Sequence, residues 1–141
     1  MGTGNSTRIT VQAVIQAPVE KVWNYWIEPE HITKWCFASE DWHAPTAEND
    51  LRPGGKFVTR MEAKDGSAGF DFGGTYDVVK EHEEISYTLG DGRKVDIRFT
   101  AQGNETKVVE TFDAEGTHSL EQQQAGWQAI MNQFKHYTEQ N

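Results

Sequence analysis

The residue best suited to chemistry in this sequence is a glutamate placed among apolar side chains. Val108, Glu110 and Phe112 occupy alternate positions of one predicted strand, so they share its inner face. An ionised carboxylate in an apolar setting is costly, so the group either has a raised pKa or has a partner. Glu110 is therefore a candidate anchor for a polar ligand atom. Two alternatives stay open: a bulge turns the side chain to solvent, or Arg98 or Tyr87 pairs with it.

Other residue types that could do chemistry form less specific patterns. Gln123 lies on the inner stripe of the last predicted helix, one turn before Trp127, and is a second polar candidate. His31, Cys36 and His43 are all zinc-ligating types, but their spacing matches no standard pattern and no fourth ligand is evident. We therefore expect no metal and no cofactor. Cys36 is expected to be a small buried residue rather than a nucleophile.

Large aromatic side chains recur on the faces that the strand pattern turns inward. Rings of this size pack with difficulty inside a curved sheet, and ligand pockets are concave and mainly apolar with a few polar groups. The sequence thus predicts a cavity under the last helix; the alternative is that the rings fill a core. The predicted lining is Trp35, Trp42, Phe57, Met61, Phe70, Phe72, Tyr76, Tyr87, Phe99, Glu110, Gln123, Trp127, Ile130 and Phe134.

The elements that must position these residues follow from periodicity and turn signals. Pro18 and Pro29 suit the starts of two short helices after the first strand. Ser119 and Gln122 have capping-box spacing at the start of a long amphipathic helix. Alternation predicts strands over residues 8–16, 42–46, 56–63, 70–79, 85–89, 95–99 and 106–112, with a bulge or bend at Gly73-Gly74. The result is an α+β fold, a curved antiparallel sheet of six to seven strands wrapped around the C-terminal helix.

Length and charge restrict the class of protein. The 141 residues suit a single domain, with residues 1–7 expected to be a disordered N-terminus. The chain carries 13 basic and 22 acidic residues, a net charge of −9, which argues against binding to nucleic acid or to an anionic membrane. One cysteine permits no internal disulfide, and no export signal or membrane span is evident, so we expect a cytoplasmic protein.

Four sequence motifs, taken in order, resemble one family. They are residues 17–23 (APVEKVW), 28–35 (EPEHITKW), 51–57 (LRPGGKF) and the pair Gly126-Trp127. Together they resemble the START-like, or helix-grip, superfamily, and within it the homologues of the activator of heat-shock-protein-90 ATPase. The resemblance covers residues 9–138 and implies the helix-grip fold. It does not fix function, because the superfamily includes lipid carriers, hormone receptors, cyclases and co-chaperones.

Three functions follow as hypotheses. The first is binding of a small apolar or amphipathic ligand between the sheet and the last helix. The second is a co-chaperone-like interaction module that stimulates a chaperone ATPase, which requires an exposed apolar patch. The third is a cyclase- or hydrolase-like enzyme, which requires two titratable groups with pKa values pushed apart. Only Glu110 fits that last requirement, so a non-enzymatic role is favoured. Either a monomer or a homodimer is compatible with an open sheet edge.

Overall fold

The computed structural model describes residues 7–141. The expected disordered N-terminus therefore falls almost wholly outside the described residues. The elements follow in the order β1 (Arg8–Ile15), α1 (Val19–Ile27), α2 (Pro29–Trp35), β2 (Trp42–Asn49), β3 (Lys56–Ala63), β4 (Gly69–Lys80), β5 (Glu84–Leu89), β6 (Lys94–Gln102), β7 (Glu105–Asp113) and α3 (Leu120–Gln140). None of the helices within this range is long and apolar enough to cross a membrane.

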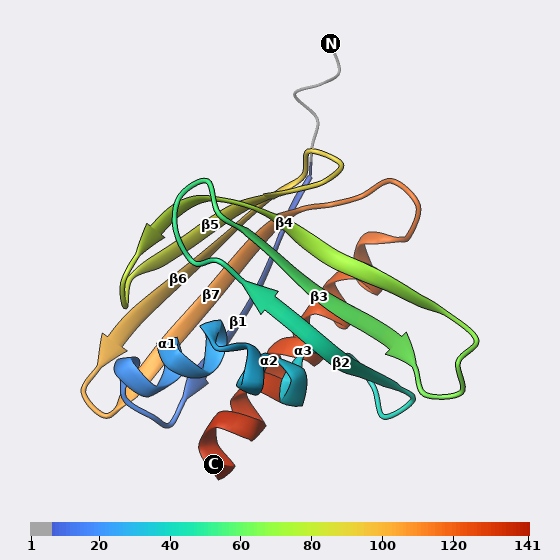
Figure 1. Cartoon of the computed structure of the whole chain (residues 1–141). Helices are drawn as coiled ribbons and strands as arrows, with labels where there is room; N and C mark the ends of the chain where they lie inside the picture. The colour runs from blue at the N-terminus through green and yellow to red at the C-terminus, as the bar shows by residue number, and fades with distance from the viewer. Residues whose placement is uncertain (1–6) are drawn as a thin grey trace.

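The seven strands form one antiparallel sheet in the order β1-β7-β6-β5-β4-β3-β2. Consecutive strands from β2 to β7 are neighbours, and β1 joins at the far edge by pairing with β7. The sheet curls into a half-barrel around α3, while α1 and α2 lie at one end of it (Figure 1). The predicted helix-grip fold is confirmed. Two strands are clearly longer than predicted: β2 runs to Asn49 rather than ending at Thr46, and β6 runs from Lys94 to Gln102 rather than over residues 95–99.

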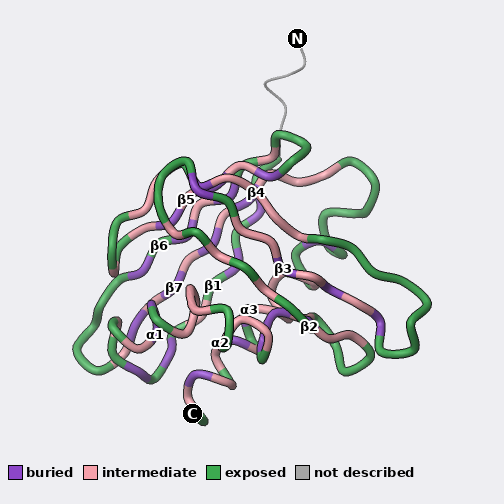
Figure 2. The backbone as a smooth tube through the Cα atoms, viewed as in Figure 1, coloured by how far each residue is buried: buried purple, intermediate pink, exposed green. Residues whose placement is uncertain are grey.

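Strand β7 shows how the sequence pattern defines the inner face of the sheet. Its buried positions are Thr106, Val108, Glu110 and Phe112, and each alternates with a more exposed neighbour. The same alternation of buried and less buried positions recurs along β5 and the first half of β6 (Figure 2). The inner face of the sheet and the apolar faces of the helices pack together into one core, because exposing either apolar surface to water would cost free energy.

The prediction of a bulge at Gly73-Gly74 is wrong. Both glycines pair regularly with β3, and the register of β4 against β5 shifts further on, between Tyr76 and Val78. The reason for glycine is close packing. A Cβ on Gly73 would lie 2.5 Å from the carbonyl oxygen of Phe57, and one on Gly74 would lie 2.4 Å from that of Thr88. Only glycine fits where the curled strands approach each other so closely.

Helix α3 is attached to the edge strand β1 through polar side chains. The Gln128 amide pairs with the backbone of Gln12: its Nε2 donates to the carbonyl oxygen at 3.1 Å, and its Oε1 accepts from the N–H at 3.4 Å. Further along, Lys135 Nζ donates to the carbonyl oxygen of Val14 at 2.7 Å. The polar face of the helix thus satisfies strand backbone groups, while its apolar face lies over the sheet.

Candidate functional site

A cavity of about 280 Å³ lies between the concave face of the sheet, α2 and α3. Its wall is mainly apolar and mainly aromatic, with few polar groups. The lining residues are Trp26, Ile32, Trp35, Cys36, Phe57, Thr59, Met61, Phe70, Phe72, Tyr76, Ile85, Tyr87, Arg93, Glu110, Trp127 and Ile130. The ring of Phe70 is 47% exposed, so it lies at the mouth. A space under the last helix is thus present in the structure.

Three neighbouring strands supply an aromatic cluster to the wall. Phe57 on β3 meets Tyr87 on β5 edge to face, with ring centroids 4.7 Å apart. Phe72 on β4 stands edge-on to Tyr87 at 6.4 Å. These centroid distances lie in the range of favourable aromatic pairs, so the rings pack against one another and form one wall of the cavity. The inward positions follow from strand alternation, which is why the sequence could indicate them.

Trp127 brings α3 onto this wall. One face of its indole stacks on Phe112, with centroids 3.8 Å apart and planes inclined by 11°. Its ring also meets Phe72 at 5.9 Å and lines the cavity. The neighbouring Gly126 makes no close contact with a strand, because a Cβ built on it has no atom within 4 Å.

Glu110 is the carboxyl group of the cavity. Its side chain faces inward, and the residue is only 6% exposed. Among residues 7–141 the Glu110 carboxyl forms no hydrogen bond or ion pair, whereas Arg98 pairs with Asp96 at 3.0 Å and with Glu84 at 3.6 Å. Neither a turn to solvent nor a pairing with Arg98 occurs, so the inward-facing prediction is confirmed. Burial raises the pKa of Glu110 from 4.5 to about 8.

Two further polar groups lie on the same wall, the Tyr87 hydroxyl and the Cys36 thiol. Burial, reinforced by the nearby charge of Glu110, raises the pKa of Cys36 to about 12 and that of Tyr87 well above 10. A thiol that remains protonated is a poor nucleophile, as the sequence indicated. Both groups are therefore hydrogen-bond donors at neutral pH, not acids or bases.

Arg93, in the turn between β5 and β6, is the cationic residue of the lining. Its Nε donates to Oδ2 of Asp91 at 2.7 Å, so the guanidinium has a carboxylate partner outside the cavity. The positive charge still acts on the wall, since it lowers the pKa of Tyr87 against the larger effect of burial. Glu110, by contrast, has no such partner among residues 7–141.

Three aromatic residues of the predicted lining lie elsewhere. Phe99 and Phe134 are buried in the core around Trp26, at centroid distances of 6.0 Å and 4.8 Å. Trp42 packs at 6.0 Å from Phe70 and is not part of the wall. The sequence pattern assigned these rings to the correct face. It could not show that α1 fills the end of the half-barrel where Phe99 and Phe134 lie.

Gln123, the second polar candidate, is also absent from the cavity wall. Its side chain binds the loop that precedes α3: Oε1 accepts from the N–H of Glu115 at 2.8 Å, and Nε2 donates to the carbonyl oxygen of His118 at 2.8 Å. A third hydrogen bond joins Nε2 to the carbonyl oxygen of Glu115 at 3.1 Å. The amide is thus fully used in fixing the entry to the helix.

Sequence reasoning missed several residues of the wall. Thr59 and Ile85 lie two residues from predicted lining residues on the same strands and share their face, so strand period alone could have found them. Trp26 and Ile32 lie on the helices that close one end of the sheet, and their placement depends on how those helices dock. Arg93 belongs to a turn, where no periodic pattern indicates direction.

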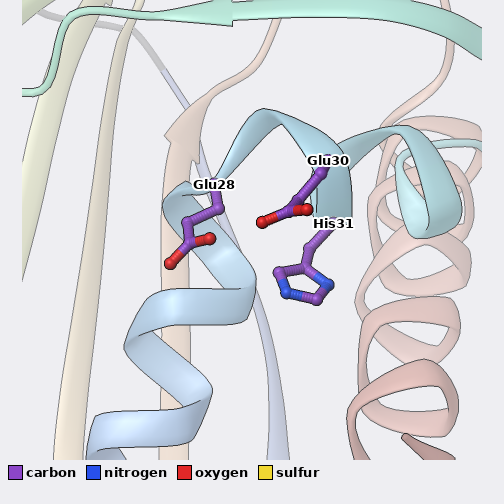
Figure 3. Close-up of side chains that lie close together, drawn as sticks. All are labelled: Glu28, Glu30 and His31. Carbon is purple, nitrogen blue, oxygen red and sulfur yellow. The ribbon is translucent and has the colours of Figure 1, made fainter.

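The zinc-ligating types singled out in the sequence do not come together. Cys36 lines the cavity, and His43 lies 3.8 Å from Glu62 on the neighbouring strand. His31 lies instead beside Glu28 and Glu30 where α1 meets α2, with one ligand atom of each within 4.8 Å (Figure 3). Both carboxylates are at least partly exposed, and such groups gather without an ion, so the cluster alone is no evidence for a metal.

A curled antiparallel sheet closed by a long C-terminal helix over an apolar cavity defines a helix-grip domain. The sequence matches the family Activator of Hsp90 ATPase homolog 1-like protein over residues 16–139, and the chain belongs to this family. No curated protein matches the sequence.

Solved structures support the assignment. The solution structure of an AHSA1-like protein from Aeromonas hydrophila shares 46% identity with a TM-score of 0.89, covering 95% of this chain and 93% of that one. A protein from Cytophaga hutchinsonii shares 60% identity with a TM-score of 0.82, at the same coverage. Protein CV1439 from Chromobacterium violaceum, at 23% identity and a TM-score of 0.84, covers 94% of this chain and 96% of that one and shows the fold alone.

Proposed function

We propose that this protein binds a small apolar or amphipathic molecule in the cavity between the sheet and α3. The observation that carries the proposal is an aromatic wall around about 280 Å³ with a single buried carboxyl group that has no partner among the described residues. Ligand sites combine such apolar surface with a few convergent polar groups. The volume lies near the lower end of the roughly 300–1,000 Å³ typical of ligand pockets, which favours a compact ring system over a long-chain lipid.

A co-chaperone-like interaction module has less support. Such a role requires a contiguous apolar patch on the surface. The large hydrophobic residues that are exposed within residues 7–141 are Val14 on β1, Phe70 on β4 and Leu120 at the start of α3. They lie on three separate elements, and one of them is at the cavity mouth.

An enzyme has less support as well. General acid–base catalysis needs neighbouring groups whose pKa values are moved apart, so that one is a base while the other is an acid. In this cavity burial moves Glu110, Cys36 and Tyr87 in the same direction, upward. All three are protonated at neutral pH to a large extent, which leaves no strong base.

The proposal can be tested by occupying the cavity from within. Ile130 lies on the cavity wall, so Ile130→Trp should fill part of the space and weaken binding of 2-ethylnaphthalene or 2-acetylnaphthalene at least tenfold. The exposed His136 lies on the same helix and away from the wall, so His136→Trp adds the same ring as a matched control. Intrinsic fluorescence and native mass spectrometry would report binding. If neither compound binds the unmodified protein, or if both variants bind equally, the proposal is wrong.

A further inference from the structure

Three polar side chains from different parts of the chain meet the cavity with unused hydrogen-bonding capacity. Glu110 comes from β7, Tyr87 from β5 and Cys36 from the residue after α2. Their exposures are 6%, 6% and 8%, and none has a hydrogen-bond partner in the part of the chain that the structure describes. Because buried polar groups are almost always paired with protein or with water, an unpaired set on a cavity wall is matched by a molecule inside the cavity, either water or a ligand that displaces it.

Resting on the proposed function, we propose that the ligand is an uncharged, mainly aromatic molecule with an oxygen that accepts hydrogen bonds, such as a ketone or ester carbonyl. The Glu110 carboxyl and the Tyr87 hydroxyl donate to that oxygen, and the rings of Phe57, Phe72 and Trp127 contact the hydrophobic part.

The protonation states of the wall make hydrogen-bond donors available to a ligand. A protonated carboxyl and a phenol each present one O–H, and a thiol presents a weak S–H. Burial keeps the proton on Glu110 up to about pH 8 and on the other two groups beyond that pH. At neutral pH the wall therefore offers donors that an acceptor oxygen would satisfy without either partner being charged.

Charge on the ligand would be unfavourable for two reasons. Moving an ion into this mostly apolar cavity costs its hydration, and only a well-placed counter-charge offsets that cost. The Arg93 charge, which acts on Tyr87, repels a cation approaching the same wall. Arg93 is itself paired with Asp91, so it is not free to neutralise an anion fully.

The surroundings of Glu110 make its titration simple to read. The residues paired with it on the flanking strands are Val11 on β1 and Ile97 on β6, and both are apolar. Helix α3 contributes Trp127 and Ile130 to the wall. The titratable or charged residues that share the wall are Cys36, Tyr76, Tyr87 and Arg93. Burial raises the pKa of Cys36, Tyr76 and Tyr87, so these three groups keep their protons over the range in which Glu110 titrates.

Four naphthalenes of similar shape test the ligand class: 2-acetylnaphthalene, 2-ethylnaphthalene, 2-naphthoate and 2-naphthylmethylammonium. Affinities measured by calorimetry at pH 6.5 should rank the acetyl compound first, roughly 3- to 10-fold above the ethyl compound for each hydrogen bond gained. Affinity for the acetyl compound should stay constant to about pH 7.5 and fall above pH 8, as Glu110 loses its proton. Affinity for the ethyl compound should not follow that profile.

Variants separate the donors from the cavity itself. Tyr87→Phe should weaken the acetyl compound roughly 3- to 10-fold and leave the ethyl compound unchanged. Glu110→Gln retains a neutral donor, so the acetyl compound should still bind, now without the fall above pH 8. Glu110→Leu should remove the preference for the acetyl compound that this donor provides. Glu48→Gln removes an exposed carboxylate and is the matched control. Circular dichroism at each pH would verify that the variants are folded.

The outcomes distinguish this inference from the proposed function. If no probe binds, the proposed function fails. If the ammonium compound binds best and tightens as pH rises through 8, Glu110 acts as a counter-ion, and the inference is overturned while ligand binding stands. Equal affinity for the acetyl and ethyl compounds would overturn it too, because the donors would then contribute nothing.

Discussion

Phe112 and Trp127 stack face to face, at 3.8 Å between centroids, and join the last strand to the last helix. Phe112 is completely buried, whereas Trp127 is only partly buried. Phe112 lies two residues from Glu110 on β7, so its stacking with Trp127 holds α3 over the part of the cavity where the carboxyl lies. One tryptophan thus connects the packing of α3 with the shape of the candidate site.

Truncation of that tryptophan should cost less than truncation of a core ring. Trp127 is packed against Phe112 on one face and borders empty space elsewhere, so Trp127→Ala should lower the free energy of unfolding by about 2 kcal/mol. Phe134 is fully buried, and Phe134→Ala should cost about 3–5 kcal/mol. Urea unfolding measures both. Equal losses would show that Trp127 is an ordinary core residue.

Replacement of the mid-helix glycine should stabilise the protein. Gly126 is helical, and a Cβ at this position would meet no atom within 4 Å. Gly126→Ala should therefore raise the free energy of unfolding by about 1 kcal/mol, the difference in helix propensity. Gly74→Ala is the contrasting variant, because its Cβ would collide with the backbone of Thr88 and should destabilise. A thermal unfolding midpoint that falls for Gly126→Ala would contradict this account.

The buried carboxyl should make stability depend on pH in a definite direction. The pKa of Glu110 is about 8 in the folded protein and near its ordinary value of 4.5 in the unfolded chain, so the folded state holds the proton more tightly. Stability from this group is present below pH 4.5 and is lost progressively as pH rises to about 8.

Glu110→Gln should abolish that loss. Relative to the unmodified protein, the variant should gain stability as pH rises, reaching on the order of 3 kcal/mol at pH 7 and levelling off above pH 8. Urea unfolding at pH 5, 6, 7 and 8.5 would measure the difference, with Glu48→Gln as the control for an exposed carboxylate. A difference that does not change with pH would show that Glu110 titrates normally.

The loop before α3 should depend on Gln123. Gln123 is buried, and Gln123→Leu leaves the backbone N–H and carbonyl oxygen of Glu115 without their side-chain partner, which should cost about 1–3 kcal/mol. Gln124→Leu, at the exposed neighbouring position, loses only a long 3.5 Å contact with the carbonyl oxygen of Thr10 and should change stability by less than about 0.5 kcal/mol. Amide hydrogen exchange should quicken over residues 114–119 in the first variant only. Equal exchange in both would refute this role.

The sequence was sufficient for the fold because its signals were local and mutually consistent. Alternation defined the strands, and the capping box of Ser119 and Gln122 defined the start of α3. Both side-chain hydrogen bonds of that box are present. The inward direction of Glu110 followed from the same period of two.

The sequence could predict a residue of the site only where the face of the strand on which its side chain lies is enough to put it on the cavity wall. Phe57 and Tyr87 face the cavity because their strands alternate, but Phe99 faces the same side and lies in filled core. Which end of the half-barrel is filled depends on the docking of α1 and α2, which is a matter of tertiary packing. Gln123 shows the limit again, since its partners are backbone groups of a loop that no periodic pattern describes.

The attachment of α3 to β1 has a consequence for how folded chains meet. An edge strand normally offers free backbone groups to which a strand of another molecule can add. On β1 the side chains of Gln128 and Lys135 already donate hydrogen bonds to backbone carbonyl oxygens, so α3 covers this edge where an eighth strand could otherwise pair. At the opposite edge, β2 carries Pro45, which has no N–H, within a shift of register. Both edge strands of the sheet therefore offer fewer free backbone groups to another chain. Unfolding of α3 would free those of β1 and so permit aggregation through that strand.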